Sequence, residues 1–268
     1  MRIRRTLTAL SSLIAVALVT LSGHAAAEPA SGTAPLIVGG TDATEAYPFA
    51  TALLNSADES FVCSASLVER QWVLTAAHCV YSMQPGELKV RVGSHDRTSG
   101  GEVRAVSKLT LHPDYDDTEQ TRVDADIALV KLAEPVTESA PVERASEQTE
   151  PGTEGRLLGW GQQCAEPGGC DSAVTLQELD TVTVGDGCGY GYNPDTEFCQ
   201  DPGPGKGMCF GDSGGPHLLP TEHGWRLAGV TVRLGYYEGG DMPDCGQGAT
   251  IATDVAYYDD WIDTELAR

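Results

Sequence analysis

The hexapeptide at residues 211–216 reads Gly-Asp-Ser-Gly-Gly-Pro, and its residue types point more directly to chemistry than any other part of the sequence. Glycines on both sides of Ser213 let the backbone turn sharply and leave the hydroxyl exposed beside unobstructed N–H groups. A serine becomes a useful nucleophile only when a base removes its proton and donors stabilise the oxyanion that forms. The alternative interpretation is a glycine-rich turn.

A base and a carboxylate occur in suitable settings. His78 follows the apolar run 72–74 and two alanines, which leave its imidazole room to project. Asp126 opens the apolar run 127–132, a strand pattern that predicts a carboxylate at the edge of a buried sheet, where it needs a partner. Asp124 competes for this role but lacks the apolar run directly after it. His24 lies in the leader. The other histidines are interpreted as structural or solvated: His95, His112, His217 and His223.

His78, Asp126 and Ser213 follow one another in an order that resembles the chymotrypsin-like, or trypsin-family, serine endopeptidases, over residues 37 to about 262. The resemblance implies that Ser213 attacks the peptide carbonyl, His78 transfers the proton and Asp126 orients the imidazole. It also implies an oxyanion hole made by the N–H groups of Gly211 and Ser213. The implied fold is all-β, with two antiparallel six-stranded β-barrels, the site in the cleft between them, and a C-terminal α-helix.

The tetrapeptide at residues 37–40, Ile-Val-Gly-Gly, matches the amino terminus that this family frees by removing a propeptide. The resemblance implies that the new ammonium of Ile37 pairs with Asp212 and turns the N–H of Gly211 into the oxyanion hole. Such a buried ion pair acts as a switch more than as a source of stability. Taken alone, the tetrapeptide also fits a strand that ends in a turn.

The first residues have the pattern of a secretory leader. Three arginines within residues 2–5 precede an apolar run over 10–21 and three alanines that end at Ala27, which predicts a signal peptide at 1–27. The run is too short for a membrane span, and no later run is long enough, so we expect a secreted protein with no membrane contact in its mature form. The twin arginine at 4–5 leaves a second export route open.

A propeptide is then expected at residues 28–36. It ends in Leu36, where trypsinogen-like zymogens carry Lys or Arg. Activation by a protease that accepts leucine is therefore our hypothesis, and this enzyme itself is a candidate.

Eight cysteines in an exported chain predict disulfides, although eight cysteines can pair in many ways. The resemblance implies three pairs, and the two cysteines that remain are close enough for a local bridge: Cys63 with Cys79, Cys188 with Cys199, Cys209 with Cys245, and Cys164 with Cys170. Zinc is not expected, because Cys-x-x-Cys pairs and histidine clusters are missing. The loop 93–102 lacks the spaced oxygens of a calcium site, so we predict neither calcium there nor any other cofactor.

The charge is strongly acidic. The chain holds 17 Lys plus Arg and 39 Asp plus Glu; removing residues 1–36 takes three arginines and one glutamate, leaving 14 against 38 and a net charge of −24. Such a surface disfavours nucleic acid and favours cationic partners or solubility in salt. Of these interpretations we favour a solvated acidic surface without a dedicated partner. We expect a monomer whose partner is a protein or peptide substrate.

The mature length allows two modest domains, which we place at residues 37–145 and 146–268 on either side of a polar, proline-containing connector. Short apolar runs separated by Gly, Pro and Asp predict strands at 51–54, 87–92, 127–132 and 226–232. Apolar residues at three- and four-residue spacing predict one helix, over 254–267.

Substrate preference is predicted from the pocket that the resemblance implies. Gly207 stands at the floor, where trypsin-like enzymes carry an aspartate, and Met208 follows it. The wall at 231–235 reads Thr-Val-Arg-Leu-Gly in place of the usual Ser-Trp-Gly, with Leu234 in it, and Thr250 stands where a glycine often opens the pocket. These residues favour a small or medium aliphatic side chain before the scissile bond, because an apolar floor leaves a cation unpaired.

Three alternatives remain. A trypsin-like preference would follow if Asp241 or Asp244, in the apparent insertion 236–244, entered the pocket. A catalytically inactive binding protein on the same fold is disfavoured because the three catalytic candidates, the oxyanion glycine and the activation terminus occur together. An esterase of the α/β-hydrolase class would need Ser before Asp before His, with alternating helices and strands.

Overall fold

A computed structural model describes residues 37–119, 122–166, 168–189, 191–235 and 243–268, with side chains left out over 117–124. The predicted signal peptide at 1–27, the predicted propeptide at 28–36 and most of the insertion at 236–244 therefore lie outside the described residues. Among the described residues, no helix is long and apolar enough to cross a membrane.

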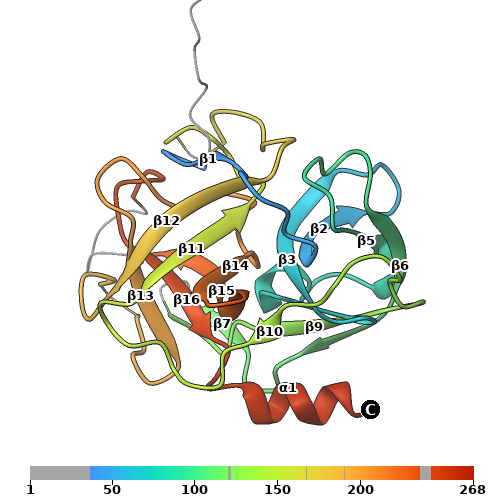
Figure 1. Ribbon diagram of the computed structural model, residues 1–268. Helices are drawn as coiled ribbons and strands as arrows, with labels where there is room; N and C mark the ends of the chain where they lie inside the picture. The colour runs from blue at the N-terminus through green and yellow to red at the C-terminus, as the bar shows by residue number, and fades with distance from the viewer. Residues whose placement is uncertain (1–36, 120–121, 167, 190, 236–242) are drawn as a thin grey trace, which may run out of the picture. The chain divides into compact units, whose positions relative to one another are not determined.

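The first barrel is a closed ring of six antiparallel strands in the order β2-β3-β4-β9-β6-β5 (Figure 1). In β5 burial alternates along the strand, since Leu88, Val90 and Val92 are buried while the two residues between them are partly exposed, so one face of this strand points into the barrel. The strands are β2 (Ala50–Asn55), β3 (Phe61–Glu69), β4 (Trp72–Thr75), β5 (Leu88–Val92), β6 (Glu102–Leu111) and β9 (Ala128–Leu132).

The second barrel follows the order β12-β11-β14-β15-β16-β13 and closes because β13 also pairs with β12. All six neighbouring pairs are antiparallel. The strands are β11 (Glu154–Gly159), β12 (Gln177–Val184), β13 (Glu197–Asp201), β14 (Pro216–Thr221), β15 (Gly224–Leu234) and β16 (Thr250–Asp254). The predicted all-β class with two six-stranded barrels is confirmed.

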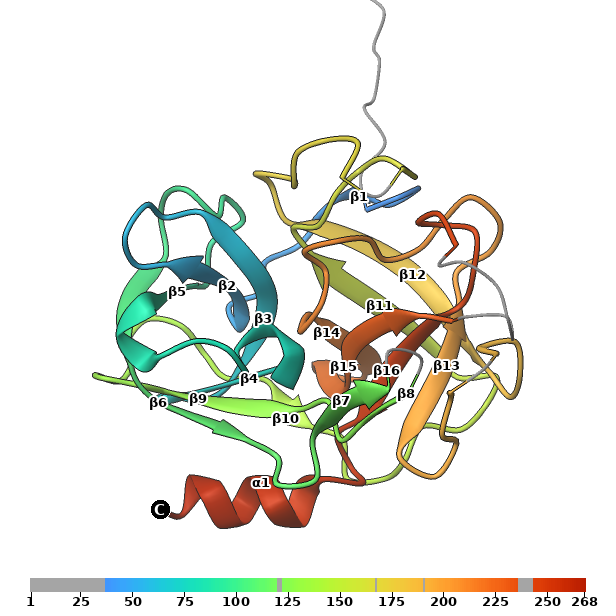
Figure 2. The ribbon, with the colours of Figure 1, turned by 180° about the vertical axis from the view of Figure 1, so that it is seen from behind.

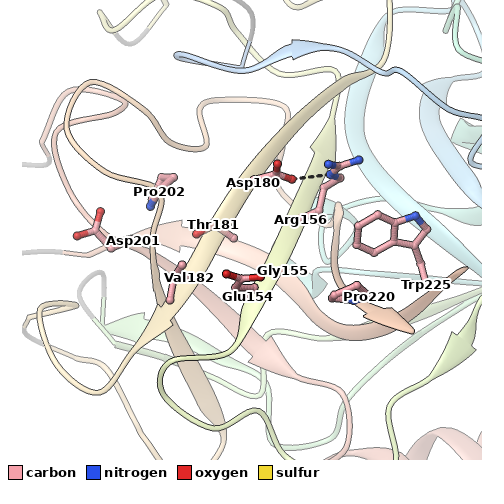
Figure 3. Close-up of a pocket in the computed structure, with 10 residues that line it drawn as sticks. All are labelled: Glu154, Gly155, Arg156, Asp180, Thr181, Val182, Asp201, Pro202, Pro220 and Trp225. Carbon is pink, nitrogen blue, oxygen red and sulfur yellow. Dashed lines mark hydrogen bonds and ion pairs between the residues drawn. The ribbon is translucent and has the colours of Figure 1, made fainter. Parts of the chain in front are cut away.

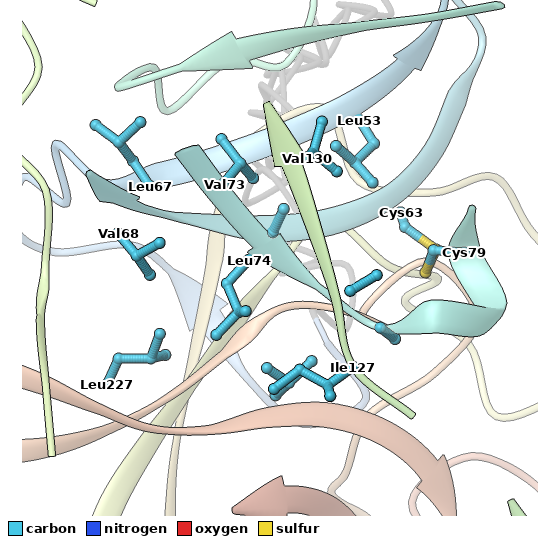
Figure 4. Close-up of a cluster of buried hydrophobic side chains, with 14 of the residues drawn as sticks. Leu53, Cys63, Leu67, Val68, Val73, Leu74, Cys79, Ile127, Val130 and Leu227 are labelled. Atoms are coloured by element: carbon cyan, nitrogen blue, oxygen red, sulfur yellow. A yellow bond between two sulfur atoms is a disulfide. The ribbon is translucent and has the colours of Figure 1, made fainter. Parts of the chain in front are cut away.

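One hydrophobic core runs through both barrels. Figure 4 shows Leu74 and Ile127 of the first half of the chain beside Leu227 of β15, and all three are fully buried. Burying such side chains stabilises the fold by roughly 1.5–3 kcal/mol each. The two barrels therefore hold each other in place, and residues contributed by different barrels can keep a fixed geometry.

Three segments outside the twelve barrel strands join one barrel to the other. The short strand β1 (Thr41–Asp42) pairs with β12, and β10 (Glu143–Arg144) runs parallel to β15. The helix α1 (Asp259–Leu266) instead packs on the first barrel, where Ile262 joins the core (Figure 2). The remaining elements are β7 (Asp116–Glu119), β8 (Arg122–Asp124) and two single 3₁₀ turns, η1 (Ala77–Cys79) and η2 (Pro85–Glu87).

The predicted strands are confirmed with small shifts at their ends, since β5 and β9 each begin one residue later than expected. The predicted helix began too early. Asp254 is the last residue of β16, opposite Gly229, and its carboxylate accepts hydrogen bonds from the N–H groups of Ala256 and Thr149. This turn delays the helix until Asp259.

Four disulfides join the cysteines of the described chain, and no cysteine is free. They are the pairs expected from the sequence: Cys63–Cys79, Cys164–Cys170, Cys188–Cys199 and Cys209–Cys245. Three of these four bridges close local loops, and the fourth spans the 36 residues from Cys209 to Cys245.

Candidate active site

His78 is presented by the short turn η1, directly after strand β4. Ala76 and Ala77 before it are fully buried, and the disulfide from Cys79 to Cys63 ties the turn to β3. The imidazole itself stays one-third exposed. The turn thus fixes the histidine backbone while leaving the ring open on one side.

Asp126 stands behind the histidine, with only 2% of its side chain exposed. One carboxylate oxygen lies 2.7 Å from Nδ1 of His78, and the other accepts a hydrogen bond of 2.9 Å from the backbone N–H of the same residue. The preceding Ala125 has a positive φ of 50°, which turns the chain into this position. Asp124, the competing candidate, lies in β8 opposite Asp116, and its side chain is outside the described ones.

The surroundings of His78 change its proton affinity in two directions. Burial lowers the pKa of the imidazole, but the charge of Asp126 and the hydrogen bond to it raise the pKa by more. The pKa of His78 therefore lies above its ordinary value. Arg233 has a smaller, opposing effect on the same pKa through its positive charge.

Ser213 lies in the segment between β13 and β14, where the glycines after it are sterically required. Gly214 has φ +77°, and a Cβ there would come within 2.1 Å of the Thr75 hydroxyl oxygen. A Cβ on Gly215 would lie 2.5 Å from the carbonyl oxygen of Leu158. The N–H of Ser64 donates to the carbonyl of Ser213 at 3.0 Å, which fastens the segment to the first barrel.

The backbone beside Ser213 has two N–H groups that donate to no acceptor among the described residues, those of Gly211 and Ser213. The carbonyl of Gly211 is held by Ser64, whose N–H and hydroxyl donate to it at 3.1 and 2.9 Å. Both Gly211 and Ser213 line the same cavity. The contacts with Ser64 hold this segment in place, while the N–H groups of Gly211 and Ser213 remain available to an acceptor in the cavity.

The cavity beside these groups has a volume of about 340 Å³ and contains His78 and Ser213 together in its wall. Two of the four predicted pocket residues, Met208 and Leu234, also line it. Gly207 and Thr250 do not: Gly207 is buried with its N–H bonded to Val38, and Thr250 is fully buried. The complete lining is Val62, Cys63, His78, Met208, Cys209, Phe210, Gly211, Ser213, Val232, Arg233, Leu234 and Cys245.

The cavity wall includes two side chains that the sequence did not single out as site residues. Phe210 is 48% exposed, which is unusual for so large an apolar side chain, and Arg233 is an ion-pairing residue next to the apolar Val232 and Leu234. Arg233 belongs to the segment 231–235, where Thr-Val-Arg-Leu-Gly replaces the usual Ser-Trp-Gly. That replacement was the sequence signal that could have indicated Arg233 as a residue of the site. Asp244 is exposed and bonds to Gln247, and it does not line the cavity; Asp241 lies outside the described residues.

Asp212 is fully enclosed, and its carboxylate fits a slot between two glycines. A Cβ on Gly159 or Gly161 would lie within 2.4 Å of the carboxylate. One oxygen accepts from the N–H of Gly161 and the other from the N–H of Cys209, both at 2.8 Å. Burial raises the pKa of this carboxyl to about 7, and these two hydrogen bonds offset only part of that rise.

Ile37, the expected partner of Asp212, is also fully buried. Its side chain packs with Leu157 and Leu179 of the second barrel. No cation among the described residues is paired with the Asp212 carboxylate.

The metal-binding capacity of the described residues is small. The one group of potential ligands close enough to share an ion is Cys63, His78 and Cys79, and its two sulfurs are joined in a disulfide, which leaves no thiolate. In the loop 93–102, the carbonyls of Arg97 and Gly100 accept hydrogen bonds from the Arg91 guanidinium. A cationic side chain thus already uses these oxygens.

A second cavity, of about 410 Å³, lies along β11 and β12 and ends at Trp225 (Figure 3). Arg156 projects beside it, with its guanidinium 2.7 Å from Asp180 and stacked over the Trp225 ring. The charge of Arg156 is therefore neutralised within the fold. None of the three predicted catalytic residues lines this cavity.

Two six-stranded barrels that bring a histidine, a buried aspartate and a glycine-flanked serine to their junction are the arrangement of a two-barrel serine protease. A sequence model of the trypsin family matches residues 37–262. The chain is 38% identical over 218 residues to a trypsin of Sarcophaga bullata, covering 75% of this chain and 82% of that protein. It is 34% identical over 232 residues to a trypsin of Saccharopolyspora erythraea, covering 83% and 95%. The protein belongs to the trypsin family of serine proteases.

Membership fixes the broad function. The protein is a hydrolase, and its substrates are proteins or peptides. Proteases of this family are typically extracellular, and four disulfides fit that environment.

Proposed function

We propose that the protein is a secreted serine endopeptidase that hydrolyses peptide bonds through an acyl-enzyme on Ser213. The observation that supports this most is the cavity whose wall contains both Ser213 and His78, with Asp126 hydrogen-bonded behind the histidine at 2.7 Å. Each group needed for acyl transfer is then within one site.

In the proposed mechanism, Asp126 keeps the proton of His78 on Nδ1, which leaves Nε2 free to accept the proton of Ser213. The serine oxygen attacks the substrate carbonyl, and the N–H groups of Gly211 and Ser213 stabilise the oxyanion. His78 then donates the proton to the leaving amine. In the second half of the reaction, water attacks the acyl-enzyme while His78 takes its proton, and His78 returns the proton to Ser213 as the acid product leaves. The Asp126 carboxylate stabilises the imidazolium in both halves of the reaction.

Activation is proposed to follow cleavage after Leu36, with removal of residues 1–27 as signal peptide and 28–36 as propeptide. The freed ammonium of Ile37 would pair with Asp212, whose enclosed carboxylate has hydrogen bonds but, among the described residues, no cationic partner. A buried carboxylate with a raised pKa gains most from such a partner. We also propose that residues 37–145 and 146–268 form the two halves of the mature enzyme. The mature enzyme is proposed to act as a monomer.

For specificity, we propose an aliphatic residue before the scissile bond. Met208, Val232 and Leu234 give the cavity apolar walls, and each is at least 95% buried. The described part of the cavity wall contains no carboxylate, so a substrate Lys or Arg would lose its hydration without gaining a partner.

A second candidate is cleavage after Lys or Arg. It is favoured by the name trypsin that both relatives carry. It requires an acidic side chain that the described part of the cavity wall does not supply.

The test is hydrolysis of tetrapeptide p-nitroanilides with Ala, Val, Leu, Phe, Lys or Arg before the scissile bond. The full chain is expressed in an exporting host, and the secreted protein is purified and its amino terminus sequenced. Ser213→Ala is the control for contaminating proteases. We expect cleavage after Ala, Val or Leu and a terminus at Ile37.

The other results are equally informative. Cleavage confined to Lys and Arg would contradict the aliphatic pocket and support the second candidate. Activity that persists in Ser213→Ala and stays with the protein through every purification step would contradict the assignment of the nucleophile, whereas activity that separates from it would come from a contaminant. A correctly folded protein without any peptidase activity would favour the inactive binding protein.

A further inference from the structure

Arg233 is the one arginine in the cavity wall beside Ser213, and it does not take part in the proposed acyl transfer. It lies near the end of β15, and its side chain is only 11% exposed. A buried guanidinium is costly unless it is paired, so its partner shows what holds it in place.

The partner is Glu197, at the start of β13. The two guanidinium nitrogens of Arg233 lie 2.5 and 2.9 Å from the two carboxylate oxygens, which is the bidentate fork geometry. The Glu197 side chain is itself 5% exposed and also accepts the N–H of Asn193. Arg233 donates further to the carbonyl of Gly191.

These contacts connect two parts of the cleft. Gly191 and Asn193 belong to the loop closed by the disulfide Cys188–Cys199, while Arg233 belongs to the strand that lines the cavity. The pairing of Glu197 with Thr253 in the sheet brings the group close to the catalytic side, because the Thr253 hydroxyl donates to the Asp126 carbonyl at 3.1 Å. The ion pair thus clamps the loop onto the end of β15.

The end of β15 has an unpaired edge. Its pairing with β14 stops at Val230, whereas its pairing with β16 continues to Leu234. Residues 232–234 all line the cavity, and within the described parts of the chain no strand pairs with their other side, so this edge can receive a ligand. An extended peptide binds such an edge by adding a strand to the sheet.

We propose that Arg233 is a positioning residue: clamped by Glu197, it fixes the open edge of β15 so that the substrate residues before the scissile bond bind there as an added strand. The inference rests on the proposed peptidase activity and deepens it. A single acyl residue reaches Ser213 without using this edge, but a longer peptide depends on it.

The test compares a single-residue ester with p-nitroanilides of two and four residues, using secreted protein processed from the full chain. In wild type, kcat/KM should rise from the short to the long substrate. In Arg233→Ala we expect this rise to be about tenfold smaller, a loss equal to one or two net hydrogen bonds. The charge of Arg233 lowers the pKa of His78, so its removal raises that pKa further, and the rates are compared at a pH well above it. Under this condition the change should fall mainly on KM. Ester hydrolysis should fall by a smaller factor than hydrolysis of the longer peptides, because the ester does not reach the edge of β15.

Paired variants separate positioning from folding. Removing one partner leaves an uncompensated buried charge, whereas removing both costs less stability. Arg233→Ala with Glu197→Ala should therefore recover thermal stability without recovering the length effect. Arg144→Ala is the matched control, because Arg144 pairs with Asp259 and Asp263 of α1, outside the cavity wall. It should lower stability and leave the length dependence unchanged.

Two results would overturn the inference. An unchanged length dependence in Arg233→Ala would show that the edge needs no clamp, and an equal loss on the ester and the long peptides would show a general structural role. Failure of wild type to hydrolyse both the ester and the peptides would instead remove the proposed function, and this inference with it.

Discussion

Asp126 fixes His78 at two points at once, because one carboxylate holds both the ring Nδ1 and the backbone N–H. The two contacts set the position of the residue and the plane of its ring. The charge of this carboxylate and its hydrogen bond to the ring also explain why the pKa of His78 is raised although burial alone lowers it. A protonated imidazole cannot act as base, so we expect activity to fall as the pH drops through this raised pKa.

Asp126→Asn tests this at the level of one atom. We expect kcat to fall by about 10⁴-fold, the loss known for this exchange in the same kind of triad, because the amide favours the wrong tautomer. The acid limb of the kcat/KM profile should move to lower pH, since burial then lowers the pKa of His78 without opposition. The measurement is a pH–rate profile of both proteins; an acid limb that stays in place would contradict the assignment.

The predictability of the site differs from residue to residue. His78, Asp126 and Ser213 each stand in a short local pattern whose chemistry can be read without knowing the fold. The Arg233–Glu197 pair joins residues 36 positions apart. Nothing local to either residue indicates the other, and only the strand order of the second barrel brings them together.

At the level of elements, Glu102 shows how a strand is joined to the loop that follows the first barrel. It begins β6 and is 8% exposed, and its carboxylate accepts the backbone N–H groups of Thr137, Glu138 and Ser139. Arg104 adds an ion pair at 2.6 Å. Burial raises the pKa of Glu102, but these hydrogen bonds outweigh it and bring the pKa to about 2.

Glu102→Gln is expected to destabilise the protein by up to about 3 kcal/mol at pH 7, because a lowered pKa means that folding favours the charged form. That contribution is present above the pKa of the unfolded chain, about 4.3, and is lost as the pH falls toward 2. The measurement is urea unfolding of Ser213→Ala protein across this pH range. Exposed Glu134 provides the control as Glu134→Gln. A difference that does not shrink with acid would argue against the carboxylate as the cause.

The elements were easier to predict than their ends. Alternating or continuous apolar runs indicated β5 and β15 because burial follows such patterns directly. The helix start was wrong because Asp254 has tertiary partners, the sheet neighbour Gly229 and the distant N–H of Thr149, that the helical spacing does not reveal. The proline-rich connector likewise gave no sign that β10 would pair with the second barrel.

At the level of the whole molecule, the amino-terminal segment belongs to the second barrel although the chain then enters the first. Ile37 is buried against Leu157 and Leu179, and β1 pairs with β12. This brings the start of residues 37–40 into the barrel that contains Asp212. A cut before Ile37 is then a change within the core, and its effect extends to the stability of the protein as a whole.

Cleavage after Leu36 is therefore expected to change how stability depends on pH. In the uncut protein, burial raises the pKa of Asp212 to about 7, well above its unfolded value of about 3.9. The folded state then holds a proton that the unfolded state releases, so the free energy of unfolding should fall as the pH rises from about 4 to about 7. In the cut protein, an ammonium beside the carboxylate removes this penalty. The difference between the two forms should grow to as much as about 4 kcal/mol near pH 7 and shrink above pH 8, where the ammonium loses its proton.

The comparison uses Ser213→Ala precursor and the same protein cut in trans by a trace of active enzyme, each unfolded with urea from pH 4 to 9. Asp212→Asn in both forms is the matched control, because the neutral amide keeps the shape and cannot titrate. Its two curves should run parallel. Parallel curves for the Asp212 proteins as well would show that the new terminus does not reach this carboxylate, and activation would then have to act on the oxyanion segment without a change of charge in the core.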